Sequence, residues 1–256
     1  FKWSENILNH VKNDIPIPRM YFPYIPKNIS QYETNKKKLV FTAILLPIAL
    51  RGNELVLEER KQMKIAFSTN NIYQIERFSK KYKIKNFKKI NFSTLNRSEL
   101  RRIKLELLNK INSIPISLIL AQSIIESGWG ASRFAQEGNA LFGQWTWSGE
   151  GLKPKEADES QGHKVMKFNV LQASVRAYQR NLNTHKTYKD FRLARAQLRD
   201  EGQPLDSIIL AQFLDEYAET GQEYVKILRK IIDQNNLKDF DNAKLLPSSM
   251  ELESLI

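Results

Sequence analysis

The apolar stretch from Ile116 to Ile125 constrains this chain most, because its hydrophobic residues do not lie on one side of a helix. Pro115 belongs in a first helical turn, and Ser113 is a candidate N-cap residue. Ser127-Gly128 predicts the end of the helix. A helix that is apolar on nearly every side has to be buried, so we expect a central core helix. Its last turn carries one carboxylate, Glu126.

Glu126 is the first candidate for catalysis. A carboxyl group at this place loses hydration, and the helix C-terminus adds negative partial charge, so both effects predict a raised pKa. An acid that stays protonated can donate its proton to the leaving oxygen of a glycosidic bond. The alternative is a helix-terminal glutamate that points into water or pairs with an arginine, which is the commoner state.

Short motifs surround Glu126 and continue toward the C-terminus. They are Ala121-Gln122, Glu126-Ser-Gly-Trp-Gly130, Ser132, Asn139, Leu141-Phe-Gly143, Gln144-Trp145, Asn181 to His185, Tyr188, Tyr217 to Gly221, and Tyr224-Val225. In order and approximate spacing they resemble the signature of the peptidoglycan-cleaving glucosaminidase family, which includes flagellar muramidases and bacterial autolysins. The likeness is greatest to the Bax-like branch of that family. It covers residues 95 to 245 and, more weakly, residues 36 to 60.

The resemblance implies an α+β, mostly α-helical fold with a lysozyme-like catalytic domain, a small β-hairpin lobe and a helical N-terminal extension. It also implies hydrolysis of the β-1,4 bond after N-acetylglucosamine in peptidoglycan, with Glu126 as the general acid. We expect an extended arm and helical extension over 1–95, the catalytic domain over 96–245 and a tail over 246–256. A lytic transglycosylase and a non-catalytic wall-binding or assembly protein are the alternatives.

The resemblance further implies a second acidic residue in a hairpin over residues 148–164. By register this is Glu156, with Asp158 and Glu159 as substitutes, although Lys155-Glu156-Ala157 stands where the family commonly has Thr-Glu-Tyr. An acidic surface turn is the alternative. Tyr217 and Tyr224 match family positions that supply a cleft-lining tyrosine, and core packing of one of them is the alternative.

The substrate-binding residues that the resemblance implies are Gln122, Ser127, Trp129, Asn139, Phe142, Gln144 and Trp145. Trp145 and Trp147 differ in parity from Phe142 along an alternating segment, so we expect Phe142 in the core and at least one of the two tryptophans toward a cleft. The three histidines are far apart in the sequence, and the chain has no cysteine. No metal-binding or nucleotide-binding motif is present, so we expect no metal and no cofactor.

The chain is basic, with 40 Lys and Arg against 28 Asp and Glu and a net charge of +12. Such a charge attracts polyanions, but it does not choose among nucleic acid, anionic envelope polymer and a membrane surface. Six lysines between Lys80 and Lys89 form either a solvated face or a docking surface. We expect a monomer that acts on peptidoglycan strands, with the basic N-terminal region near envelope polymer or membrane and no nucleic-acid partner.

The N-terminal part predicts an extended arm and two helices. Prolines are dense up to Pro26, which favours an extended arm over residues 1–30. Two helices should meet at a hinge near Pro47 or Arg51-Gly52-Asn53. The apolar run from Leu39 to Leu50 is shorter than the roughly 20 residues of a membrane span. We expect the periplasm or cell envelope as the location, with a signal peptide already removed before Phe1.

Overall fold

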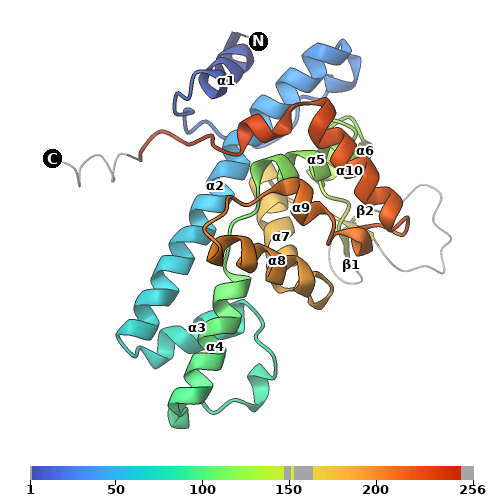
Figure 1. The fold of residues 1–256 in the computed structure, drawn as a ribbon. Coiled ribbons are helices and arrows are strands. Elements are labelled where there is room, and N and C mark those ends of the chain that lie inside the picture. Colours follow the sequence, from blue (N-terminus) through green and yellow to red (C-terminus); the bar gives the residue numbers. More distant parts are fainter. Residues whose placement is uncertain (1, 147–150, 153–163, 249–256) are drawn as a thin grey trace. The chain divides into compact units, whose positions relative to one another are not determined.

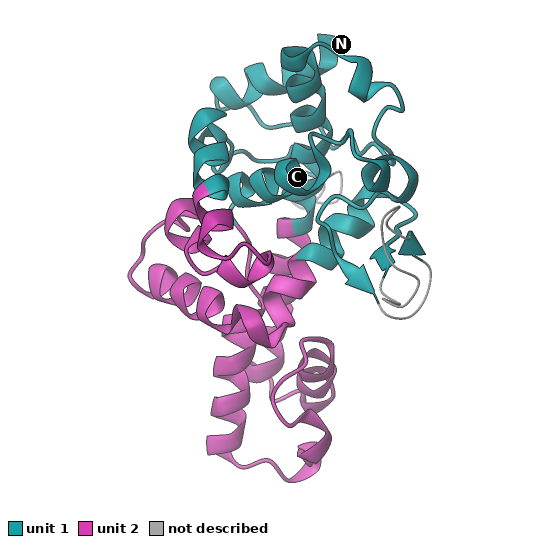
Figure 2. Cartoon of the chain, turned by 90° about the vertical axis from the view of Figure 1, so that its right-hand side faces the viewer, with its two compact units in different colours: residues 1–52, 115–178, 227–256 teal, residues 53–114, 179–226 magenta. Residues whose placement is uncertain are grey.

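The computed structural model describes residues 2–146, 151–152 and 164–248, which are mostly helical (Figure 1). The chain forms two compact units from segments that are discontinuous in the sequence (Figure 2). Unit 1 contains residues 1–52, 115–178 and 227–256, and unit 2 contains residues 53–114 and 179–226. These units differ from the domains expected from the sequence, whose boundaries lie near residues 95 and 245. Those domain boundaries stay a prediction.

Unit 1 contains a small antiparallel sheet and the helices that surround α5 (Ile116–Ser127). The other helices are α1 (Lys2–Lys12), η1 (Ile29–Gln31), the first half of α2 (Thr34–Ser68), α6 (Arg133–Gly138), the start of α7 (Leu171–Thr184), the end of α10 (Gln222–Gln234) and η6 (Leu237–Phe240). Strands β1 (Trp145–Thr146), β2 (Gly151–Leu152) and β3 (Lys164–Met166) are ordered β1-β3-β2. Val165 lies opposite both Trp145 and Leu152. The expected α+β, mostly helical fold with a small β lobe is confirmed.

Helix α5 is buried from Ile116 to Ile124, as its apolar pattern predicts. It begins with Pro115 at the N-cap position, which supplies no side-chain hydrogen bond, so the expected N-cap role of Ser113 is wrong. Asp241, next to η6, takes that role instead, because its carboxylate accepts from the Ser117 N–H and the Ser117 hydroxyl at 2.8 Å each. The helix ends at Gly128, whose φ of 57° is left-handed.

Helix α2 runs without interruption from Thr34 to Ser68, so the predicted hinge at Pro47 or at residues 51–53 is wrong. Proline costs a helix interior about 3 kcal/mol. Residues 40–50 are all buried, and this burial outweighs the local cost of Pro47. By length and composition α2 could cross a membrane, but 72% of its apolar window is buried inside the protein. A core helix passes the same test.

The first twelve residues also differ from the expected extended arm, because Lys2–Lys12 form helix α1. This part contains no proline, and the proline-rich sequence starts only at Pro16. The extended part after α1 is held in place by a short bridge to the C-terminal segment. Ile17 N donates to Lys244 O at 2.7 Å, and Leu246 N donates to Ile17 O at 2.8 Å.

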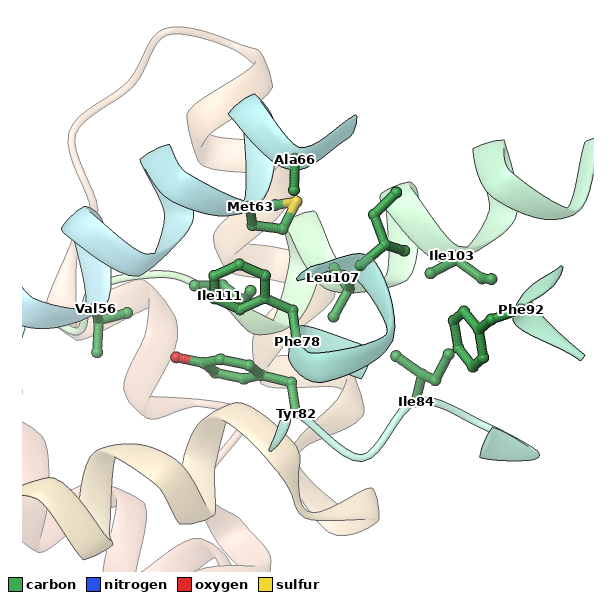
Figure 3. Close-up of a cluster of buried hydrophobic side chains, with 11 residues drawn as sticks. Val56, Met63, Ala66, Phe78, Tyr82, Ile84, Phe92, Ile103, Leu107 and Ile111 are labelled. Atoms are coloured by element: carbon green, nitrogen blue, oxygen red, sulfur yellow. The ribbon is translucent and has the colours of Figure 1, made fainter. Parts of the chain in front are cut away.

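Unit 2 has its own hydrophobic core between the second half of α2, α3 (Ile72–Lys81) and α4 (Arg97–Lys110). Figure 3 shows Met63 of α2, Phe78 of α3 and Leu107 of α4 in this cluster. The remaining elements are η2 (Phe87–Lys89), η3 (Phe92–Thr94), η4 (Lys186–Tyr188), α8 (Lys189–Asp200), α9 (Ser207–Ala211) and η5 (Asp215–Tyr217). Helix α4 begins with a capping box between Asn96 and Glu99.

Buried cations bind the backbone carbonyls at the end of α4. Arg195 is fully buried and donates to Asn109 O at 2.9 Å, Ser113 O at 3.1 Å and Asn112 O at 3.2 Å. Arg60 donates to Leu108 O and Ile111 O. Burial and the nearby Arg199 lower the pKa of Arg60 to about 10, and burial lowers the pKa of Arg195 well below its usual range. These cations are therefore held by carbonyl dipoles at the negative end of a helix.

We predict that Arg195→Met lowers the free energy of unfolding by about 3 kcal/mol, because three carbonyls lose a hydrogen bond and only Asn112 O keeps another donor, from Asn183. Relief of the buried charge offsets only part of this loss. Urea unfolding measures the change. Arg180→Met is the matched control, since Arg180 is exposed on α7. Equal stability of the two variants would contradict a structural role of the carbonyl contacts.

A second prediction concerns Glu33, which caps the start of α2. Its carboxylate accepts from Asn35 N at 3.0 Å and from Lys36 N at 3.2 Å, and these bonds, with Asn35 first, lower its pKa below the usual 4.5. The stabilisation is therefore complete above pH 4.5 and is lost as the pH falls through the lowered value. Glu33→Gln should lower the melting temperature more at about pH 7 than at about pH 3. An equal decrease at both pH values would contradict this assignment.

Candidate active site

Glu126 lies in the last turn of α5, and its side chain is half-buried. Its carboxylate packs against the backbone of Gly143, which precedes β1. A Cβ atom built on Gly143 would lie 2.6 Å from Oε2 of Glu126 and 3.5 Å from its Cδ. The side chain is thus held between the end of a buried helix and the segment that leads to the sheet, rather than extended into bulk water.

Gly143 is the residue that sequence reasoning gave no role, although it stands in the Leu141-Phe-Gly143 motif. Its φ of 60° is left-handed, and the space beside it is occupied by the Glu126 carboxylate. A glycine is therefore required here for two separate reasons, the backbone conformation and the close approach. A glycine that follows an apolar pair was the available signal, but only the fold shows what approaches it.

Gln122 and Phe142 form the packing behind Glu126. Gln122 lies one helical turn before Glu126 and is fully buried, and its Oε1 accepts from the Tyr178 hydroxyl at 2.5 Å. Phe142 is buried and stacks on the Tyr178 ring, with 4.1 Å between centroids and 14° between planes. Gln122 thus fixes Tyr178 and Phe142 rather than presenting its amide to solvent. The expected core position of Phe142 is confirmed.

Ser127 stabilises the turn that follows α5. Its hydroxyl donates to Ser123 O at 2.6 Å and accepts from Gly130 N at 2.9 Å, and the side chain is buried. The turn contains three successive positive φ values, at Gly128, Trp129 and Gly130. This geometry closes the helix directly after Glu126, so the contribution of Ser127 to the site is structural support.

Trp129 faces α2 and η6. Its ring lies edge-on to Phe41, with centroids 5.9 Å apart, and the Lys38 ammonium lies 5.2 Å from the indole centroid. The indole lines a cavity of about 720 Å³ together with Lys36, Asn235 and Phe240. The Lys38 ammonium also donates to Asn235 Oδ1 at 2.9 Å. Lys38 covers a face of the indole, so that face is occupied by a cation.

Asn139 and Gln144 connect the site to the β lobe and α7. Asn139 ends α6 with a φ of 50°, as expected for a left-handed cap, and its Nδ2 donates to Phe168 O at 2.9 Å. Gln144 donates from Nε2 to Ala177 O at 3.4 Å. Its Oε1 is buried and has no hydrogen-bond partner among the described residues. This oxygen is an acceptor close in sequence to Gly143.

Trp145 in β1 is 52% exposed, in contrast to the buried Phe142. The buried Phe142 and the exposed Trp145 agree with the expectation, and Trp147 lies outside the described residues. An exposed indole on a small sheet offers a flat apolar surface of the kind that can pack against a pyranose ring. Glu156, Asp158 and Glu159 lie outside the described residues.

Tyr217 and Tyr224 belong to unit 2, where they stack on one another with centroids 5.6 Å apart. Tyr224 is buried and Tyr217 is half-exposed, as expected if one of the two packs in a core. Tyr188 extends this group, with its ring centroid 6.1 Å from that of Tyr217. His185 is exposed, and its Nδ1 accepts from Thr187 N at 3.4 Å, so it caps η4.

Among the residues that the structure describes, no group of three His, Asp or Glu side chains could hold a metal ion. A model of the glucosaminidase family, described as mannosyl-glycoprotein endo-beta-N-acetylglucosaminidase, matches residues 103–237. The chain belongs to this family. The match contains α5 with Glu126, the Gly143 contact, the β lobe and both tyrosines. The candidate residues therefore lie in the part of the chain that defines a glucosaminidase.

The chain is also similar to two individual proteins. It is 29% identical over 209 residues to Protein bax of Escherichia coli strain K12, and the alignment covers 78% of this chain and 70% of that protein. A crystal structure of the catalytic domain of the autolysin Auto from Listeria monocytogenes matches at 19% identity with a TM-score of 0.39. That match covers 70% of this chain and 88% of the autolysin chain.

The Gly143 contact leads to a prediction about this glucosaminidase. Gly143→Ala should abolish most glycan hydrolysis, because the new Cβ displaces the Glu126 carboxylate. Gly202→Ala is the control, since Gly202 also has a positive φ, of 69°, but nothing lies within 4 Å of the position that its Cβ would take. Both variants should lose about 1 kcal/mol of stability from the left-handed backbone. If both kept full activity, the contact would have no role in positioning Glu126.

Proposed function

We propose that this protein hydrolyses the β-1,4 glycosidic bond after N-acetylglucosamine in bacterial peptidoglycan, with Glu126 as the general acid. Family membership supports a glycoside hydrolase, and the contact between the Glu126 carboxylate and Gly143 is the observation that carries the choice of residue. A proton donor has to stay within hydrogen-bond reach of the bridging oxygen. A carboxyl group fixed by a helix end and a glycine backbone meets that need better than a mobile surface side chain.

The reaction needs a proton for the leaving oxygen and a partner for the anomeric carbon. Glu126 supplies the proton. The positive charge that develops on the anomeric carbon is met in one of three ways. A carboxylate about 6.5–9.5 Å away activates water, a carboxylate at about 5 Å attacks directly, or the acetamido oxygen of the substrate attacks. Glu156 is the carboxylate that we propose for the first two routes, and the third requires a group that orients the acetamido arm.

Trp145, close to Gly143, suits the sugar, because its exposed indole provides a flat platform for a pyranose face. Gln144 supports the same segment, with its Nε2 donating to Ala177 O and its Oε1 buried. Since peptidoglycan lies outside the cytoplasm, we place the reaction in the cell envelope, in the periplasm of a Gram-negative cell.

Glu126→Gln should reduce hydrolysis of purified sacculi by about 10²–10⁴-fold, because the amide keeps the shape of the side chain but cannot donate the same proton. Binding to sedimented peptidoglycan should persist. Glu137→Gln is the control, since Glu137 is exposed on α6 and its carboxylate lies 3.3 Å from the Arg133 guanidinium, in a surface ion pair. A fully active Glu126→Gln variant would show that Glu126 is not the general acid.

The products of the same digestion show which glycosidic bond is cleaved and by which reaction. After borohydride reduction, mass spectrometry should find reduced N-acetylglucosamine at the new chain ends. Anhydro-muramyl ends would instead identify a lytic transglycosylase. If the wild-type protein bound peptidoglycan and released no sugar, the protein would be a wall-binding module.

The two stacked tyrosines allow a further test. We propose that Tyr217 orients the acetamido group or the attacking water, because its ring is half-exposed and the Tyr224 ring is buried. Tyr217→Phe should lower kcat about tenfold or more with a smaller change in KM. Tyr224→Phe is the matched control, in which the same hydroxyl is removed from a buried ring. An equal loss in both variants would indicate packing rather than orientation.

A further inference from the structure

A second surface of this protein lies in unit 2, on the part of the chain between residues 53 and 114. These residues contain 15 Lys and Arg against 6 Asp and Glu, so they hold most of the net charge of +12. The charge is exposed, because 13 of the 15 cations lie at the surface and only Arg60 and Lys110 are partly or fully buried. A positive surface of this density attracts an anionic partner.

Two helices of this region lie side by side. Arg60 of α2 donates to Leu108 O and Ile111 O, at the C-terminal end of α4. Lys104, nearer the start of α4, has its ammonium 5.9 Å from the ring centroid of Phe67 on α2. The two contacts make the helices antiparallel neighbours. Their inner sides, which include Met63 and Leu107, form the core in Figure 3.

The outer sides of the same two helices form one surface, which we name the α2–α4 face. It consists of Leu57, Lys61, Lys64 and Ile65 from α2 and Arg101, Lys104 and Leu105 from α4. All seven side chains are exposed, and their helical spacing of three and four residues puts them on one side of each helix. The three aliphatic side chains on this one face are exposed by 39% for Leu57, 51% for Ile65 and 55% for Leu105.

The face therefore combines three exposed aliphatic side chains with four cations. Glu58 is the exposed acid at its edge, and its Oε1 accepts from Gln62 at 3.4 Å. Among the described residues, no ion pair is formed by Lys61, Lys64, Arg101 or Lys104. A surface with apolar side chains between unpaired cations is typical of proteins that bind at the headgroup level of a bilayer.

We propose that the α2–α4 face attaches this protein to a membrane surface that contains anionic lipid. The cations meet the headgroups, and Leu57, Ile65 and Leu105 enter the boundary between headgroups and acyl chains. A soluble polyanion uses the cations but gains nothing from exposed leucine and isoleucine. Nucleic acid would favour aromatic rings for stacking, and the face has none. The combination of charge and aliphatic exposure thus favours a bilayer over a polymer.

Vesicle co-sedimentation of the full chain tests this proposal. The wild-type protein should bind vesicles of equal parts phosphatidylglycerol and phosphatidylcholine, and should not bind phosphatidylcholine alone. Lys61→Gln with Lys64→Gln should weaken binding about fivefold for each cation. Ile65→Gln with Leu105→Gln should weaken it about fivefold for each residue, since roughly half of each side chain is available for burial.

Two double variants in the same unit are matched controls. Lys88→Gln with Lys89→Gln makes the same change in net charge at exposed positions outside the face, and it should weaken binding less than twofold. Leu193→Gln with Ile209→Gln removes two aliphatic side chains that are each 45% exposed, and binding should not change. Thermal unfolding of each variant confirms folding, and the two pairs of the face are tested independently, so one unfolded variant leaves the other informative.

Three outcomes would overturn the proposal. One is equal weakening by the Lys88 and Lys89 control, which would indicate net charge alone. Another is unchanged vesicle binding of the Ile65 and Leu105 variant. The last is tighter binding to soluble polyphosphate than to the phosphatidylglycerol vesicles at equal phosphate concentration. In that case the face binds polyanions. Cleavage of soluble glycan fragments should be unaffected in the face variants, which separates this test from that of the proposed function.

Discussion

The burial of α5 on nearly every side is the constraint on which unit 1 depends. A helix without a polar stripe has to be surrounded, and η6, α7 and the segment before β1 contribute to that surrounding. Burial fixes the helix, the left-handed Gly128 fixes its end, and Glu126 is consequently held two residues before that end. Gly143 then limits the space of the carboxylate from the other side. The packing of α5 and the backbone of Gly143 together determine where Oε2 of Glu126 lies.

Unit 2 depends on a different interaction, the binding of backbone carbonyls by buried cations. Arginine is costly to bury, and the lowered pKa values of Arg60, Arg192, Arg195 and Arg199 express that cost. The carbonyls at and just after the end of α4 compensate for Arg60 and Arg195. Arg192 donates instead to Leu182 O and His185 O at the end of α7, and Arg199 donates to the Asn112 side-chain oxygen. The loop from Ile111 to Ile114, which leads into α5, is held in this manner at successive carbonyls, with Asn53 binding both the N–H and the C=O of Ile114.

The aromatic residues around Glu126 show how far local pattern can be read. Phe142 is buried and Trp145 is exposed, as the alternating pattern predicted, but the left-handed Gly143 between them shows that this segment is not one continuous strand. Trp129 could not be placed in the same way, since its surroundings are Phe41 and Lys38, which are far away in the sequence. Gln122 and Ser127, which we predict at the substrate site, bind Tyr178, Ser123 and Gly130, and these partners too could not be read from local pattern.

The amino-acid sequence by itself determined the mostly helical fold, the buried helix, its end at Gly128 and the place of Glu126, because periodicity and helix termination act over a few neighbouring residues. It also determined the family, through motifs that keep their order. Tertiary structure decided the continuity of α2 through Pro47, the capping of α5 by Asp241 and the contact between Gly143 and Glu126. The Asp241 cap and the Gly143 contact join residues that are distant in the sequence. The continuity of α2 results from burial that outweighs the local cost of Pro47. None of the three features can therefore be predicted from a few neighbouring residues.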